Sequence, residues 1–215
     1  MKKTPWPTKA VMQQIYEKQL WGGNAFDYYS GEGSHKPEII QPYIAAIVDF
    51  LTSHNNNLTV CDLGCGDFNV GCHLVEYTRQ YFAIDIVPEL IERNKTRFEA
   101  AQLEFQCLDI STDDLPQADC AILRQVLQHL SNKEIQQILD KLQPYNYLIL
   151  TEHLPNGSFT PNIDIIANRG NRLKHKSGVD ILEAPFKFKA KAHTILNKLV
   201  LEGGKSKIVT TLYIK

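Results

Sequence analysis

The amino-acid sequence predicts an α/β protein built on an open, mostly parallel β-sheet with helices on both faces. Short apolar runs, of the kind that form buried parallel strands, recur along residues 58–151. Segments with helical spacing separate these runs, and a glycine turn follows the first of them. Strands that alternate with helices at this rhythm are typical of a parallel sheet covered on both faces.

Each expected element can be placed along the chain. The five predicted strands of the sheet are residues 58–63, 81–86, 104–108, 118–124 and 145–151. Helices are predicted at residues 8–20, 37–53, 70–78, 88–102 and 133–142. Ser131 and Asn132 are good N-cap residues for the last of these helices. Near the end, Gly203 and Gly204 separate residues 193–201 from residues 207–214, and we predict a closing antiparallel hairpin there.

The composition excludes several classes of protein. Hydrophobic residues make up 43% of the 215 residues and charged residues 22%, which is ordinary for a globular protein. A formal net charge of -1 gives no overall attraction to nucleic acid or to an anionic membrane. Every apolar run falls short of the ~20 residues that span a bilayer. Residues 1–8 lack the apolar core of a secretory signal, so a cytoplasmic protein is expected.

The cysteines point to neither disulfides nor zinc. The chain has five of them, and an odd number in a chain of this size does not suggest a disulfide framework. Cys61, Cys65 and Cys72 lie close in sequence, but their spacing matches no zinc pattern. Glu152, His153 and Asp164 could also be considered as metal ligands, although their spacing is not diagnostic. We therefore expect structural thiols and no metal centre.

The strongest chemical signal is the glycine turn in the run CDLGCG at residues 61–66. Glycines let a ligand approach the backbone closely, and a helix that starts there offers free N–H groups. Asp62 argues against a dinucleotide, because its carboxylate would repel the pyrophosphate. Asn69 also stands where a dinucleotide site requires a third glycine. S-adenosylmethionine suits this turn better, since it carries an ammonium and a sulfonium and no phosphate.

Acidic residues follow the next two predicted strands. Asp85 stands 85 − 62 = 23 residues beyond Asp62, where a carboxylate can accept two hydrogen bonds from a ribose diol. Asp109 can accept the amino group of adenine, with Ile110 against the ring. In the alternative interpretations, Asp85 caps the helix that begins near Pro88, and Asp109 is a solvent-facing turn residue.

Together these blocks resemble the class I S-adenosylmethionine-dependent methyltransferases of the bacterial small-molecule type. The matching blocks are VCDLGCGDFNVG (60–71), AIDIVPELI (83–91), CLDIS (107–111) and ADCAILRQVLQHLS (118–131), in the family's order and spacing. The resemblance implies a Rossmann-like, seven-stranded sheet of order 3-2-1-4-5-7-6, with strand 7 antiparallel. The cofactor-binding residues that it implies are Asp62, Gly64, Gly66, Asp85, Ile86, Asp109, Ile110 and the backbone of Arg124.

Phe68 departs from the family pattern, because many members have a glycine at this position. We include Phe68 among the expected cofactor-binding residues, with its ring either on the cofactor or turned into the core. The first two glycines make the close approach, so the departure affects the shape of the loop rather than binding itself.

The resemblance implies transfer of a methyl group from S-adenosylmethionine to a small-molecule acceptor, with S-adenosylhomocysteine as the product. O-methylation and N-methylation both stay open, as do the acceptor, which could be a sugar or another metabolite, and the oligomeric state. We expect a single methyltransferase domain over residues 1–215. Within it, residues 1–53 form the N-terminal helices and lid, 54–152 the cofactor-binding core, and 153–215 a substrate loop and closing hairpin.

His129 and His153 are the catalytic candidates. Each follows a predicted parallel strand at the end where such folds bind ligands, and histidine is a base near neutral pH. The alternative is that His129 packs structurally.

Acceptor binding is expected from two other segments. Residues 21–34 (WGGNAFDYYSGEGS) combine glycines with aromatic side chains, so we expect a mobile lid that uses Trp21, Tyr28 and Tyr29. A tail packed on the sheet is the alternative for this segment. Arg172, in the basic stretch 162–185, is expected to hold an acidic group of the acceptor, unless that stretch is only a solvated loop.

The sequence favours this function over three others. A nucleic-acid or protein methyltransferase on the same core is disfavoured by the near-neutral charge, and residues 123–126 lack the Asn/Asp-Pro-Pro-aromatic block of nucleic-acid amino-methylating enzymes. A non-catalytic S-adenosylmethionine-binding protein also stays open. Asp62 and Asn69 argue against a nicotinamide dehydrogenase.

Overall fold

The computed structural model describes residues 6–23 and 27–215. The strands are β1 Thr59–Leu63, β2 Gln80–Asp85, β3 Leu103–Cys107, β4 Cys120–Arg124, β5 Tyr147–Pro155, β6 Thr160–Pro161, β7 Ser177–Gly178, β8 Ala192–Val200 and β9 Ser206–Ile214. Seven of them form one sheet of order β3-β2-β1-β4-β5-β9-β8, and β6 pairs with β7. Strands β1 to β5 pair in parallel, whereas β9 runs antiparallel to both β5 and β8. The sheet order and the antiparallel strand are therefore as expected.

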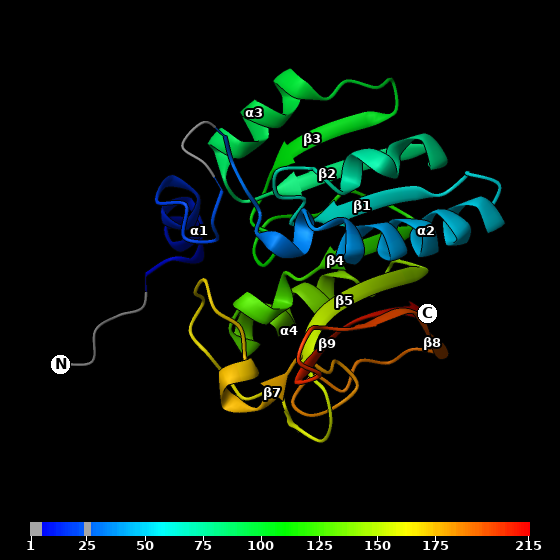
Figure 1. Cartoon of the computed structure of the whole chain (residues 1–215). Coiled ribbons are helices and arrows are strands. Elements are labelled where there is room, and N and C mark those ends of the chain that lie inside the picture. Colours follow the sequence, from blue (N-terminus) through cyan, green and yellow to red (C-terminus); the bar gives the residue numbers. More distant parts are fainter. Residues whose placement is uncertain (1–5, 24–26) are drawn as a thin grey trace.

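Helices cover both faces of this sheet (Figure 1). They are α1 Thr8–Glu17, α2 Pro37–Ser53, α3 Pro88–Arg97 and α4 Asn132–Lys141. On one face α2 buries Tyr43, Ile47 and Leu51 in a cluster that includes residues of β1, β2 and β4. On the other face α4 contributes Ile135 and Ile138 to a second cluster. Both helices are amphipathic, so burying their apolar stripes against the sheet stabilises the layers.

The start of α4 is fixed by its own sequence. Ser131 is the N-cap, its side chain accepts the N–H of Glu134, and the Glu134 side chain accepts the N–H of Ser131. This capping box satisfies two N–H groups that a helix start otherwise leaves unpaired. The N-cap prediction at Ser131 is thus confirmed.

The predicted helix at residues 70–78 is wrong. The structure has two 3-10 turns there, η2 Gly71–His73 and η3 Val75–Tyr77. Backbone φ is +61° at Phe68, and Thr78 is already extended, so few residues are left for a regular α-helix. The helix at 88–102 is also shorter than predicted and ends at Arg97, since Phe98 is extended.

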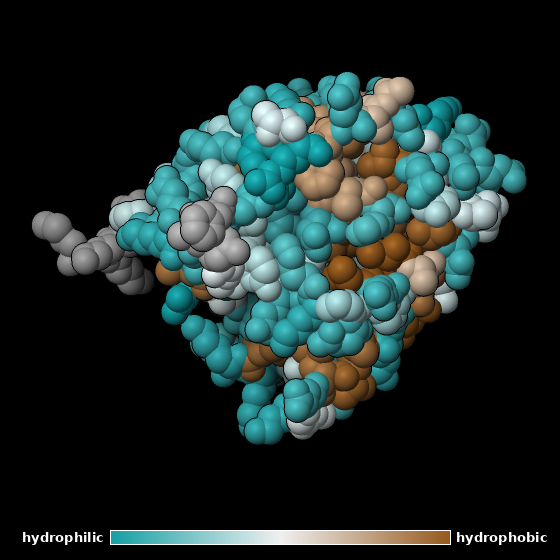
Figure 2. Space-filling model, turned by 45° about the horizontal axis from the view of Figure 1, so that its top comes forward, coloured by the Kyte–Doolittle hydropathy of each residue, from teal (hydrophilic) through white to brown (hydrophobic). Residues whose placement is uncertain are grey.

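Helix α1 lies across the carboxyl ends of the first strands, whose arrowheads point towards it in Figure 1. Figure 2 shows that hydrophobic residues on the viewed face gather mostly on the half away from α1. Within residues 6–23 and 27–215, none of the helices combines the length and apolar character that crossing a membrane requires.

Candidate active site

A cavity of about 340 Å³ lies at the carboxyl ends of β1, β2 and β4, beneath α1. The residues that line it include Met12, Tyr16, Trp21, Ser30, Asp62, Gly64, Gly66, Asp85, Ile86, Asp109, Ile110, Arg124, Gln125, Gln128, His129, Arg169 and Asn171. Nearly all of the expected cofactor-binding residues therefore share one cavity, because parallel strands end at the same edge of a sheet.

The structure of the turn requires glycine at both positions 64 and 66. Gly64 has φ +87° and Gly66 has φ +57°, a region that side chains disfavour. A Cβ atom on Gly64 would come to 2.5 Å from Val126 Cγ2, and one on Gly66 to 2.4 Å from Ser30 Oγ. The turn can thus pack between the lid segment and the loop after β4 only when both positions are glycine.

Asp62 ends β1 as a buried carboxyl group. The hydroxyl of Tyr81 donates a hydrogen bond of 2.9 Å to its Oδ2. Burial raises the pKa of Asp62 to about 7, although the Tyr81 hydrogen bond and the charge of Arg124 act in the opposite direction. A cationic group that entered the cavity would therefore favour the ionised form of Asp62.

Asp85 binds two backbone N–H groups of the turns after β1 and β2, and it also lines the cavity. It accepts the N–H of Gly66 at 3.1 Å and the N–H of Val87 at 3.1 Å. Burial raises its pKa to about 6, against the effect of these backbone hydrogen bonds. A carboxylate has about four acceptor positions, so Asp85 keeps acceptor capacity for a pair of hydroxyl groups.

Asp109 lies after β3, next to two apolar side chains of the cavity. Its Oδ1 accepts the N–H of Ser111 at 2.9 Å and the Ser111 hydroxyl at 2.6 Å. Ile86 and Ile110 line the cavity beside it. This arrangement offers apolar surfaces to a flat ring and a carboxylate to an amino group at its edge.

Phe68 does not line the cavity, and this corrects the expectation that it binds the cofactor. Its side chain is fully buried, with ring centroids of Tyr81, Phe98 and Phe105 at 5.8, 5.2 and 4.9 Å, all edge-on. Of the two possibilities left open by the sequence, the ring turns into the core, because three aromatic neighbours bury its apolar surface.

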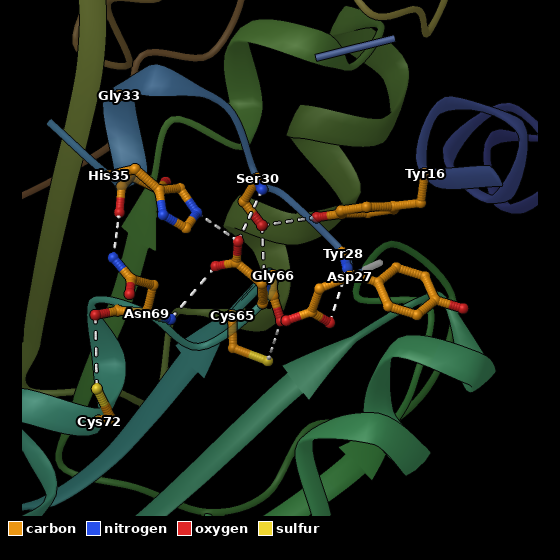
Figure 3. A network of polar contacts seen from close by, with 12 residues as sticks. Tyr16, Asp27, Tyr28, Ser30, Gly33, His35, Cys65, Gly66, Asn69 and Cys72 are labelled. Carbon is orange, nitrogen blue, oxygen red and sulfur yellow. Dashed lines mark hydrogen bonds and ion pairs between the residues drawn. The ribbon is translucent and has the colours of Figure 1, made fainter. Parts of the chain in front are cut away.

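Residues 27–35 are hydrogen-bonded to the glycine turn through Asp67. Figure 3 shows Ser30 and His35 of this segment beside Gly66 and Asn69 of the turn. Asp67 Oδ2 accepts the N–H of Ser30 at 2.8 Å, and the Ser30 hydroxyl accepts the N–H of Asp67 at 2.8 Å. His35 Nε2 donates to the same carboxylate at 2.6 Å. Asn69 of the turn donates in addition to the carbonyl of Ser34 at 2.7 Å.

A second set of contacts holds residues 27–34 from β4 and from α3. Arg124 donates to Ser34 Oγ at 3.0 Å and to the carbonyl of Gly33, and its guanidinium lies 4.9 Å from the Tyr43 ring centroid. Asp27 is paired with Arg93 and Arg97 of α3. Residues 24–26, which belong to the predicted lid, lie outside the described residues.

His129 lines the far side of the cavity, and its ring is held from both sides. Its Nδ1 donates to the carbonyl of Gly170 at 2.7 Å, which leaves Nε2 as an acceptor 3.2 Å from Gln128 Nε2. Burial lowers the pKa of His129 to about 4. The ring is therefore neutral near pH 7 and is a weak base. The Trp21 ring centroid lies 5.1 Å away.

Four other predicted residues do not line this cavity. His153 is bound to Ser206 Oγ at 2.9 Å on β5, and Arg172 is buried with its guanidinium on backbone carbonyls. Tyr28 packs edge-on against Tyr16, and Tyr29 stacks on His35 at 4.1 Å. These placements correct the roles expected for His153 as a base and for Arg172, Tyr28 and Tyr29 in acceptor binding, since each side chain is used within the protein.

Sequence reasoning also missed several lining residues. Met12 and Tyr16 belong to the apolar stripe of α1, which the sequence presents as an ordinary packing face. Arg169 and Asn171 come from a stretch without periodicity, where only its basic character gave a signal. Among the described residues, no group of three or more His, Cys, Asp or Glu side chains is arranged to hold a metal ion.

Part of the chain is similar to a known protein family. Residues 61–145 match the family model described as "Methyltransferase domain". No curated protein sequence matches the chain. The match spans 85 of the 215 residues, so this part of the chain is similar to a methyltransferase domain.

Solved structures share its fold over nearly the whole chain. One is the N-methyltransferase NodS from Bradyrhizobium japonicum WM9 in complex with S-adenosyl-l-homocysteine, with TM-score 0.65, 13% identity, and coverage of 95% of this chain and 98% of that chain. Another is magnesium protoporphyrin IX methyltransferase from Synechocystis PCC 6803 with bound SAM, with TM-score 0.58 and 16% identity. The alignment covers 99% of this chain and 100% of that chain. Human N-acetylserotonin methyltransferase in complex with SAM has TM-score 0.58 and 16% identity, and the alignment covers 98% of this chain and 60% of that chain.

Proposed function

We propose that this chain transfers the methyl group of S-adenosylmethionine to a small-molecule acceptor and releases S-adenosylhomocysteine. The observation that carries the proposal is the single cavity that joins Asp62, the glycine turn, Asp85 and Asp109 at the carboxyl ends of neighbouring strands. The solved structures of similar fold support it, because several are named as methyltransferases with SAM or S-adenosylhomocysteine bound.

The residues present fit this cofactor. Asp109, Ile86 and Ile110 would hold the adenine, and Asp85 would accept the ribose hydroxyls. Asp62 would stabilise the ammonium, because it is a buried carboxyl group without a cation hydrogen-bonded to it in the described residues. The closely packed Gly64–Gly66 turn would let the backbone reach the rest of the molecule.

The cofactor supplies a methyl group on a positively charged sulfur that is open to in-line attack. The chain's own contribution is then alignment and exclusion of water. Helix α1 and residues 27–35 cover the cavity, and the loops that carry His129 and Arg169 form its other wall. We propose that residues 1–53 act as helices and lid, 54–152 as the cofactor core, and 153–215 as the substrate loop and hairpin of one domain.

We further propose that the acceptor atom is an amine nitrogen. A hydroxyl acceptor needs a base, but burial lowers the pKa of His129, the histidine that lines this cavity in the described residues, to about 4. A neutral amine needs none, because its lone pair forms the N–C bond while the S–C electron pair stays on sulfur. The product ammonium then loses its proton to water. NodS, which has a similar fold, is named as an N-methyltransferase.

The experiment is a turnover assay with matched acceptors. Purified protein and S-adenosylmethionine are incubated with pairs such as glucosamine and glucose, which share a carbon skeleton and differ in an amine or hydroxyl group. Formation of S-adenosylhomocysteine and the mass of the methylated product are measured. We expect methylated amines. Methylation of only the hydroxyl partners would refute the nitrogen assignment, and no cofactor consumption across a broad panel of amines and alcohols would refute catalysis.

A further inference from the structure

The wall of the cavity around Gln128 and His129 is a 3-10 turn, η4 Leu127–His129, that follows β4. A turn this short leaves its last carbonyl groups without partners inside the turn. Carbonyls that face the protein interior must be satisfied from elsewhere, or the segment moves until they are. The place of Gln128 and His129 therefore depends on what binds the carbonyls of residues 127–130.

Arg172 provides most of these partners. Its Nη1 donates to the carbonyls of Leu127 at 3.1 Å and Gln128 at 3.2 Å, and its Nη2 donates to the carbonyl of Leu130 at 2.7 Å. The remaining carbonyl of the segment, that of His129, accepts the N–H of Asn168 at 3.1 Å. All four carbonyls of residues 127–130 are thus bound by residues 168–172.

The guanidinium has no donor left for a ligand. Its Nε donates to the carbonyl of Ile163 at 2.9 Å, and Nη2 also donates to Asn132 Oδ1 at 3.0 Å. These five hydrogen bonds equal the five N–H donors of an arginine. The side chain is 1% exposed, so it is a buried cation solvated by backbone carbonyls in place of water.

The same residue fixes the second wall of the cavity. Residues 169–171 lead directly into Arg172, and Arg169 and Asn171 line the cavity. Within this stretch, the carbonyl of Gly170 accepts from His129 Nδ1 at 2.7 Å, and the carbonyl of Arg169 accepts from Trp21 Nε1 at 2.9 Å. Arg172 consequently joins both protein segments that surround the His129 ring.

We infer that Arg172 is a positioning residue for the acceptor side of the site: its guanidinium sets the place of Gln128 and His129 without touching the acceptor. This inference rests on the proposed methyl transfer. Lysine cannot replace arginine here, because one ammonium group cannot reach three carbonyls of the turn in the geometry of a planar guanidinium. Displacement of groups in an active site by ~1 Å can lower the rate ~100-fold. Hydrogen bonds that fix the position of Gln128 and His129 can therefore affect the rate strongly.

The test compares Arg172→Lys with Lys174→Met, an exposed cation two residues away. Nitrogen-15 NMR of histidine-labelled protein follows the ring of His129, with His129→Gln used to assign its signals. In the wild type and in Lys174→Met, the ring should stay protonated on Nδ1 and titrate near pH 4. In Arg172→Lys we expect the His129 pKa to rise by at least one unit towards its ordinary value, as the ring loses its burial.

Two further measurements keep the outcome interpretable. A folded Arg172→Lys whose His129 titrates as in the wild type would overturn the inference. If Arg172→Lys does not fold, Asn132→Ala removes one acceptor of the guanidinium, and an unchanged His129 in that variant would equally overturn it. Calorimetry with S-adenosylhomocysteine on the wild type is a separate arm. Absence of binding in this calorimetry would count against the proposed function. An unchanged titration of His129 in the variants would count only against the role of Arg172.

Discussion

The two ends of the cavity are built in different ways. At the cofactor end, Asp62 lies near the end of β1, Asp85 ends β2 and Asp109 follows β3, and residues 27–35 are bound to the turn through Asp67. At the acceptor end, the 3-10 turn after β4 and the loop at residues 168–172 hold each other through backbone carbonyls and one buried arginine, Arg172. The first end is defined by side chains at strand ends, and the second by long-range contacts of the main chain. Substitutions at the cofactor end should therefore change the affinity for S-adenosylhomocysteine, whereas substitution of Arg172 at the acceptor end should change the pKa of His129.

The largest effect is expected from Gly64→Ala. The new Cβ would lie 2.5 Å from Val126 Cγ2 at φ +87°, so the turn must move away from its ligand position. The dissociation constant for S-adenosylhomocysteine, measured by calorimetry, should rise ~100-fold, which corresponds to ~2.7 kcal/mol. Gly203→Ala is the matched control, because φ is +82° there and no atom lies within 4 Å of its Cβ. Equal affinity of the two variants would contradict the role of the turn.

Asp85→Ala should come next, with a dissociation constant raised ~10- to 100-fold. Hydrogen bonds to charged groups contribute ~1.5–3 kcal/mol each, and the variant loses those to the ribose. Asp180→Ala is the control, because Asp180 accepts the N–H of Leu182 at 3.0 Å much as Asp85 accepts that of Val87, yet it does not line this cavity. If Asp85→Ala changes the melting temperature but not the affinity, then Asp85 only stabilises the turns after β1 and β2.

This contrast also explains how much could be read from the sequence. The strand-end carboxylates were predictable because a parallel sheet places the ends of its strands together, and the glycines because only they permit the turn. The sequence does not predict where the Phe68 ring lies, since the ring is placed by Tyr81, Phe98 and Phe105, which are distant in sequence. Arg172 was misinterpreted for a related reason: its partners are carbonyl groups, which every residue has, so no sequence pattern marks them.

The cofactor end of the cavity should also make the affinity for S-adenosylhomocysteine depend on pH. Burial raises the pKa of Asp62 to about 7, and only the ionised form attracts an ammonium. The affinity for S-adenosylhomocysteine should thus increase as pH rises from 6 to 8, by up to ~10-fold per pH unit below the pKa. Asp62→Asn should weaken binding and flatten this profile around pH 7. A slope at pH 7 identical to that of the wild type would show that another group is responsible.

The smallest effect is expected in the lid. Asp67→Asn weakens the contacts with Ser30 and His35, each worth ~0.5–1.5 kcal/mol. Amide hydrogen exchange of residues 27–35 should accelerate several-fold, whereas Glu32→Gln, which removes only an exposed pair with Lys36, should change it little. S-adenosylhomocysteine should slow exchange in the wild type. Equal protection with and without it would mean that residues 27–35 are fixed packing and not a lid.

The central claim is that the cavity beneath α1 binds S-adenosylmethionine and its product. Isothermal titration calorimetry of the purified wild-type chain with S-adenosylhomocysteine near pH 7.5 tests it most directly. We predict saturable binding with one molecule per chain and a rise in melting temperature that grows with ligand concentration. A folded protein that gives neither binding heat nor thermal shift at millimolar S-adenosylhomocysteine would contradict the account.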